Sequence, residues 1–163
     1  MNTWMMSTRG RGARWAAVGI GSLLMAAGVT SRASAEHTQL EQVSTGPTGG
    51  NAGVEANFGG ASADGTRVFF ATADSLVSAD TDTTVDVYER SGGQTTLLST
   101  GTTGGNGIFH AFFAGASADG TRVFVGTGES LVSADTDTAI DMYERSSGQT
   151  TLVSTGPTGG NGT

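Results

Sequence analysis

Two short acidic stretches carry the residues of this sequence that are best suited to chemistry. Each places three aspartates within seven residues: Asp80, Asp82 and Asp86 in the first stretch, and Asp135, Asp137 and Asp141 in the second. Carboxylate oxygens gathered in this way are the ligands that calcium uses. The helix-loop-helix calcium motif does not fit, because it needs glycine at its sixth position and glutamate at its twelfth, where this sequence has Val85 and Ser91.

Turn capping is the alternative role for these six aspartates. Aspartates in loops accept hydrogen bonds from backbone N–H groups and so hold tight turns in place. We predict this role, and therefore assign no metal ligand and no cofactor. Calcium binding stays open, because calcium outside cells is plentiful enough to fill weak sites.

Both acidic stretches belong to an internal repeat with a period of 55 residues. Residues 54–108 and 109–163 are identical at about 40 of 55 positions. A fixed period of this order is typical of propellers, solenoids and other arrays. We therefore expect a first unit over residues 53–107 and a second over residues 108–163. Residues 36–52 resemble the end of a unit and are expected to form an extra outer strand and a glycine-rich connector.

Each repeat contains four short stretches with strand character, separated by turn signals such as Asp-Gly and Ser-Gly. They are residues 56–61, 66–72, 85–90 and 94–100 in the first repeat, and 109–116, 121–127, 140–145 and 149–155 in the second. Four antiparallel strands are the content of a propeller blade. The predicted fold class is all-β, with two four-stranded antiparallel propeller-type blades forming a partial β-propeller. A parallel β-helix and a β-sandwich are the alternatives.

Apolar residues that recur in register predict the core between stacked blades. They are Phe58, Val68, Phe69, Val87 and Leu97, with their copies Phe113, Val123, Phe124, Met142 and Leu152. Tyr88 and Tyr143 are also expected to be structural. Small residues, such as Gly59 and Gly60, are expected on the innermost strand, where the blades crowd together.

The remaining candidates for chemistry give weak signals. Neither His37 nor His110 is repeated, and a lone histidine on a strand is usually structural. Glu89 and Glu144 are expected to pair with residues of neighbouring strands rather than to act as acid and base. The glycine-rich connectors lack the lysine of a phosphate-binding loop, so we expect flexible linkers. No catalytic residue is assigned, and the prediction is that the protein is not an enzyme.

Residues 1–35 have the pattern of a signal peptide. Basic residues precede an apolar run over residues 15–29, and Ala33-Ser34-Ala35 provides a cleavage site. The rest of the chain has four arginines, no lysine and fifteen acidic residues, a net charge of about −11 that excludes a basic surface for nucleic acid. We predict a secreted protein, extracellular, periplasmic or at the cell surface. The absence of cysteine excludes a disulfide scaffold.

The ordered motifs resemble a known family. SADG-x-x-V-x-F, an SLV loop with D-T-D, D-V-Y-E-R and T-T-L-V-S are similar to the TolB-like, WD-repeat-like β-propeller repeats of exported bacterial proteins. The resemblance implies a non-catalytic scaffold that contacts a protein or a small ligand. A propeller domain of an exported hydrolase and a calcium-stabilised repeat array are the alternatives.

The number of blades departs from the family pattern, since propellers need about four to eight blades and the sequence supplies two. We therefore expect either a fragment of a larger propeller or a ring closed by association. Three copies would give six blades and four copies would give eight.

Signal peptidase should remove residues 1–35 during export, so that the exported protein begins at Glu36. N-terminal sequencing checks this. Replacing Ala33 with arginine should block cleavage, because the enzyme requires a small residue there, whereas Ser34→Arg, at the middle position, should not. An exported protein that still begins at Met1 would contradict the prediction.

Overall fold

Eight β-strands form the regular structure of the computed structural model, which describes residues 40–157, 159 and 160. They are β1 (Ala56–Ala61), β2 (Arg67–Thr72), β3 (Asp86–Ser91), β4 (Gln94–Leu97), β5 (Ala111–Ala116), β6 (Arg122–Thr127), β7 (Asp141–Ser146) and β8 (Gln149–Leu152). None of the described residues lies in a helix. The predicted signal peptide and His37 fall outside the described residues.

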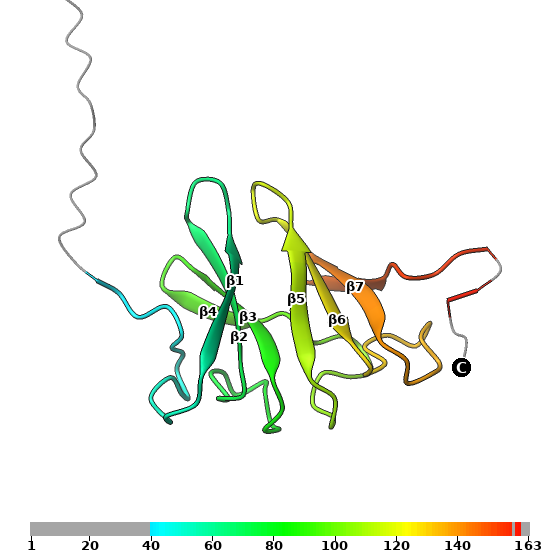
Figure 1. Ribbon diagram of the computed structural model, residues 1–163, viewed down its shortest axis with the longest axis horizontal. Helices are drawn as coiled ribbons and strands as arrows, with labels where there is room; N and C mark the ends of the chain where they lie inside the picture. Colours follow the sequence, from blue (N-terminus) through cyan, green and yellow to red (C-terminus); the bar gives the residue numbers. More distant parts are fainter. Residues whose placement is uncertain (1–39, 158, 161–163) are drawn as a thin grey trace, which may run out of the picture. The chain divides into compact units, whose positions relative to one another are not determined.

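The strands form two antiparallel sheets, one from each repeat (Figure 1). The first sheet has the order β1-β2-β3-β4 and the second has the order β5-β6-β7-β8. Their registers match after a shift of 55 residues, so that Phe58 lies opposite Phe70 and Phe113 lies opposite Val125. The prediction of an all-β fold with two four-stranded, blade-like sheets is confirmed. A parallel β-helix is excluded, because every described strand pair is antiparallel.

The turn between the first two strands of each sheet is held by an aspartate. Asp64 Oδ1 accepts hydrogen bonds from the Ser62 hydroxyl at 2.7 Å and from the backbone N–H of Thr66 at 3.1 Å. The hydrogen bond from Ser62, followed by those from Thr66, lowers the pKa of Asp64 to about 2. Asp119 repeats this arrangement in the second sheet. The Asp-Gly signal thus predicted the hairpin correctly.

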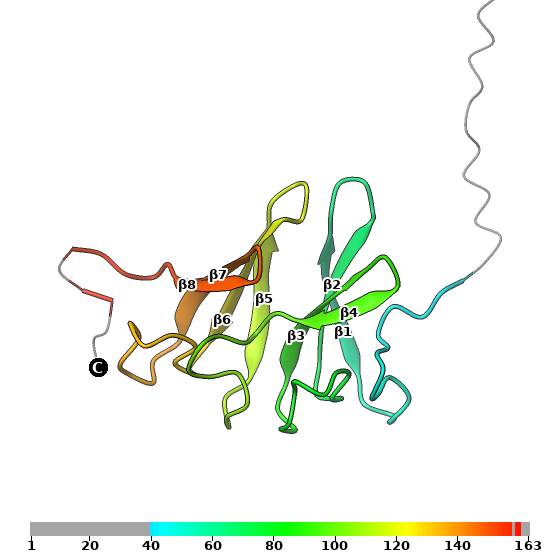
Figure 2. The ribbon, with the colours of Figure 1, turned by 180° about the vertical axis from the view of Figure 1, so that it is seen from behind.

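The outer strands β4 and β8 end earlier than the sequence suggests (Figure 2). We predicted strands to residues 100 and 155, and the structure ends them at Leu97 and Leu152. The reason is a serine beyond the end of each strand. Ser99 Oγ accepts the N–H of Val87 at 3.0 Å, so a side chain replaces the next backbone bond of the ladder.

The two sheets pack face to face, and we name the faces front and rear. The rear face of the first sheet carries Phe69, Val87 and Leu98, and it contacts the front face of the second sheet, which carries Val123, Val125 and Tyr143. The rings of Phe69 and Phe113 stack across the interface with centroids 5.5 Å apart. At the hairpin tips, which lie side by side in Figure 1, Ala63 N–H donates to Ala118 O at 2.7 Å.

The small residues of β1 make room for the neighbouring sheet. A Cβ atom at Gly59 would lie 2.8 Å from Cγ of Phe113, which is closer than real contacts allow, and one at Gly60 would lie 3.3 Å from the same ring. Strands β1 and β5 are in contact. Glycine at these positions therefore permits the stacking of Phe113 on Phe69.

The predicted core was wrong at four positions, since Phe58, Val68, Phe124 and Met142 belong to neither cluster of buried apolar side chains. Phe58 is 73% exposed, although its copy Phe113 packs in the interface. The difference arises because Phe58 lies on the front face of the first sheet, where no described sheet is stacked. Tyr88 and Tyr143 are both fully buried, which confirms their structural role.

The glycine-rich connectors over residues 44–51 and 99–106 are ordered turns, so the expectation of flexible linkers was wrong. Each packs on the front face of the sheet that follows it: Thr48 N–H donates to Leu76 O at 3.2 Å, and Thr103 N–H donates to Leu131 O at 3.1 Å. The contact is so close that a Cβ atom at Gly46 would lie 2.1 Å from the carbonyl oxygen of Leu76. Phe70 and Tyr88 are buried in a cluster with Leu76 and Leu97, and the first connector contacts this cluster at Leu76.

Replacing Phe113 with alanine should lower the free energy of unfolding by about 2 kcal/mol, because the substitution removes a ring that is stacked in the interface. Phe58→Ala is the matched control at the same repeat position. Because Phe58 is exposed, its loss should change the stability of the single chain by less than about 0.5 kcal/mol. Urea unfolding measures both. Equal decreases in the free energy of unfolding would contradict the prediction, because they would mean that Phe113 and Phe58 contribute equally to stability.

Candidate functional site

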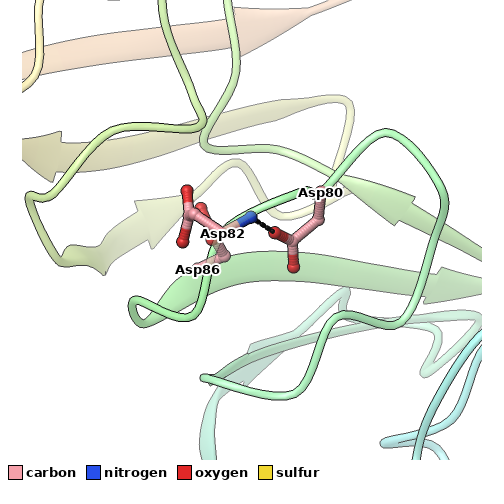
Figure 3. A group of neighbouring side chains, drawn as sticks. All are labelled: Asp80, Asp82 and Asp86. Carbon is pink, nitrogen blue, oxygen red and sulfur yellow. Dashed lines mark hydrogen bonds between the residues drawn. The ribbon is translucent and has the colours of Figure 1, made fainter.

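The six aspartates of the sequence analysis form two clusters. Asp80 and Asp82 lie in the loop between β2 and β3, and Asp86 is the first residue of β3. One carboxylate oxygen of each lies within 4.8 Å of the others (Figure 3). The loop between β6 and β7 brings Asp135, Asp137 and Asp141 together in the same way. The fold thus brings together each set of three aspartates that the sequence placed within seven residues.

Turn capping occupies part of each cluster, as predicted. Asp82 Oδ1 accepts hydrogen bonds from the backbone N–H of Thr84 at 2.6 Å and from its hydroxyl at 2.7 Å. Asp80 Oδ1 accepts the backbone N–H of Asp82 at 3.2 Å, which Figure 3 shows as a dashed line. These bonds hold the loop in a shape that turns the carboxylates toward one another.

Two hydroxyl groups that we did not predict also position the aspartates. The Tyr88 hydroxyl donates to Asp80 Oδ2, and the Ser99 hydroxyl donates to Asp86 Oδ1 at 2.5 Å. The second repeat has the same two bonds, from Tyr143 to Asp135 and from Ser154 to Asp141. The available signal was the fixed spacing of aspartate, tyrosine and serine in both repeats, but spacing alone does not show which side chains meet.

Asp86 is the most electrostatically perturbed residue of the first cluster. Burial raises its pKa to about 7, the hydrogen bond from Ser99 opposes the shift, and the charges of Asp80 and Asp82 add to it. Its side chain is only 3% exposed, and its Oδ2 atom is buried without a hydrogen-bond partner. A buried carboxylate oxygen without a partner is costly, so this atom needs an explanation beyond turn capping.

The first aspartate loop also forms the junction between the two sheets. Thr81 N–H donates to Asn106 Oδ1 at 2.6 Å, and Val85 N–H donates to His110 Nδ1 at 2.8 Å. His110 is thus a structural residue of the junction, as a lone strand histidine was expected to be. The loop that brings the carboxylates together therefore also forms hydrogen bonds with the chain that leads into the second sheet.

The glutamates form ion pairs across neighbouring strands, as predicted. Arg67 lies 2.7 Å from Glu89, and Arg122 lies 2.6 Å from Glu144. The first pair lines a cavity of about 220 Å³ between the sheets, together with Arg145 and Thr121. Arg145 donates to the Thr150 hydroxyl at 2.8 Å. Because these charged groups already have partners within the chain, the cavity is a weaker candidate site than the aspartate loops.

Comparisons with known proteins identify no relative. No family model, no curated protein and no solved structure matches the chain. The resemblance to TolB-like repeats therefore stays a prediction. Within the described part of the chain, no helix is long and apolar enough to cross a membrane.

Without divalent cations, stability should fall as pH rises from about 4 to about 7. In this range the folded state keeps a proton on Asp86, whose pKa is about 7, whereas the unfolded chain, with a pKa near 3.8, has released it. A rise in pH therefore favours unfolding, by at most about 1.4 kcal/mol per pH unit. Urea unfolding at pH 5 and pH 7, with a chelator present, measures the slope.

Asp86→Asn should remove most of this slope, because asparagine does not titrate but can still accept the Ser99 hydrogen bond. Asp64→Asn is the control, since the pKa of Asp64 is about 2 and lies below the range. If the Asp86→Asn variant keeps the same dependence of stability on pH, another titrating group causes that dependence.

Proposed function

We propose that this chain is an exported, non-enzymatic interaction module of the β-propeller type, which binds other blades of its own kind by stacking sheet on sheet. The observation that carries the proposal is that the chain contains both halves of its internal interface and leaves apolar side chains of a second copy of each half exposed. The occupant that we propose for these faces is a second copy of the chain.

The uncovered faces are counterparts of the two surfaces that pack inside the chain. On the front face of the first sheet, Phe58 is 73% exposed, whereas its counterpart Phe113 is stacked on Phe69. On the rear of the second sheet, Val153 is 40% exposed, whereas its counterpart Leu98 is 4% exposed. Each of the two surfaces that bury apolar side chains between the sheets is therefore present a second time: one on the front of the first sheet and the other on the rear of the second sheet.

The third connector, residues 154–161, supports the same proposal. Gly156 N–H donates to Gly159 O at 2.8 Å, as Gly101 N–H donates to Gly104 O at 2.9 Å in the second connector. A Cβ atom at Gly101 would lie 1.9 Å from Leu131 O, but one at Gly156 would meet nothing within 4 Å. The third connector thus repeats the hydrogen bond between its two glycines, while its Gly156 packs on no described residue.

Association would involve an exchange of connectors. Residues 154–161 have the same sequence as residues 44–51, STGPTGGN. The connector of one copy can therefore make, on the first sheet of another, the contacts that residues 44–51 make there. Because the resident connector is tethered to its own sheet, it competes at high effective concentration, and association should be weak and concentration-dependent.

Export and the absence of catalysis belong to the same proposal. The signal-peptide pattern of residues 1–35 supports export. The roles of the titratable side chains support a scaffold: Glu89 and Glu144 are held in ion pairs, and His110 accepts a backbone N–H at the junction. A ring of three or four copies would give six or eight blades, in the range of closed propellers.

Two variants that each spoil one face test the proposal by light scattering. Phe58→Glu should block the front face of the first sheet, and Val153→Glu should block the rear face of the second. Each variant alone should stay a single chain at concentrations at which the unmodified protein assembles. A mixture of the two should form a pair, because each variant keeps the face that the other has lost.

Melting temperatures control for folding, and because both side chains are exposed, they should change little. The proposal is wrong if the unmodified protein stays a single chain at millimolar concentration. It is also wrong if the two variants do not pair when mixed.

A further inference from the structure

We propose that each aspartate loop binds one divalent cation with hard oxygen ligands, and that calcium is the ion that fits best. The first site consists of Asp80, Asp82 and Asp86, and the second consists of Asp135, Asp137 and Asp141. This inference does not depend on the proposed function, since each site is contained within one repeat.

Buried oxygens without partners point to a ligand in both loops. Asp86 is 3% exposed and Asp141 is 5% exposed, and the Oδ2 atom of each is buried without a hydrogen-bond partner. In the second loop, Asp137 Oδ2 is also buried and unpartnered. Such atoms cost free energy unless something binds them, and a cation at the centre of the cluster would bind them all.

Turn capping does not account for these atoms. It uses the Oδ1 atoms: Asp82 Oδ1 binds Thr84, and Asp137 Oδ1 accepts the N–H of Ala139 at 2.8 Å. Asp86 Oδ1 is likewise taken by the Ser99 hydroxyl. The Oδ2 atoms of Asp86, Asp137 and Asp141 thus remain available to an ion while their Oδ1 atoms hold the loop in shape. Asp80 and Asp135 accept the Tyr88 and Tyr143 hydroxyls at Oδ2 and would bind an ion through remaining carboxylate lone pairs.

The repetition of the arrangement is a further argument. Both loops have the tyrosine and serine hydroxyls that fix the outer aspartates, and both leave Oδ2 of the aspartate that begins the third strand without a partner. Three carboxylates gathered without a cation would repel one another, because like charges at these distances oppose folding.

The ligand set favours calcium among the divalent cations. Aspartate oxygens are hard ligands, and calcium accepts six to eight oxygens in flexible geometry, so water and backbone carbonyls can complete the shell around three carboxylates. Magnesium demands near-ideal octahedral geometry and gives up its water reluctantly. The absence of cysteine from the chain argues against ions that prefer sulfur.

Isothermal titration calorimetry with calcium chloride tests the proposal on the full chain after treatment with a chelator. The expected result is two ions per chain. Asp86→Asn and Asp141→Asn should each reduce the stoichiometry to one, and the double variant should bind none. Magnesium chloride should bind at least about tenfold more weakly at both sites.

Glu55→Gln is the matched control, because it removes one negative charge from an exposed position outside both loops. It should still bind two ions. Circular dichroism of the asparagine variants without calcium shows whether they fold, and we expect that they do, since asparagine can keep the hydrogen bonds from Ser99 and Ser154.

Terbium luminescence gives a second measurement of binding, which does not rely on the heat that calorimetry records. The Tyr88 and Tyr143 hydroxyls bind Asp80 and Asp135, so each site has a phenol ring beside it that can sensitise the ion. Calcium should displace terbium, and the double variant should lose the signal. The proposal is overturned if calcium does not bind at millimolar concentration. It is also overturned if the double variant, Asp86→Asn with Asp141→Asn, is folded and binds as many ions as the unmodified chain.

Discussion

The packing of the rear face of one sheet on the front face of the next is the interaction on which the rest of the structure depends. Each sheet has only four short strands with apolar side chains on both faces, so it cannot bury its own core. The stacking of Phe69 on Phe113 requires glycines in β1, and the close approach of each connector requires a glycine beside the following loop. Glycines in β1 and in the connectors are therefore a consequence of these close contacts.

The first aspartate loop lies at the junction between the two repeats. The first loop binds Asn106 and His110 of the following segment, while its carboxylates face inward. Its shape depends on hydroxyls from β3 and from the end of β4, which tie the loop to the sheet. The junction and the candidate cation site thus share one network of hydrogen bonds. A change in the conformation of the loop would therefore alter its contacts with the neighbouring repeat.

The repeat in the sequence was sufficient to predict the fold class, because a period of 55 residues with four strand patterns leaves few architectures. It was also sufficient to select the aspartates, which recur in both copies. The exposure of Phe58 could not be predicted, because periodicity shows that a side chain belongs to a packing face and does not show whether that face is covered. The order in the connectors was missed because glycine-rich composition suggests freedom, whereas here glycine serves close contact with Leu76 and Leu131. The roles of Tyr88 and Ser99 required knowledge of which strands pair.

The repeats are not identical on their packing faces, and this has a consequence for selectivity. Leu98 of the rear face has Val153 as its counterpart, Val87 has Met142, and Phe70 of the front face has Val125. A contact between two copies would thus join surfaces whose side chains differ in size from those that meet within the chain. A missing or added methylene at such a contact changes affinity by about 1 kcal/mol, so the internal joint and an external one are distinguishable by shape alone. The side chains at these three positions would therefore determine which sheet packs on which.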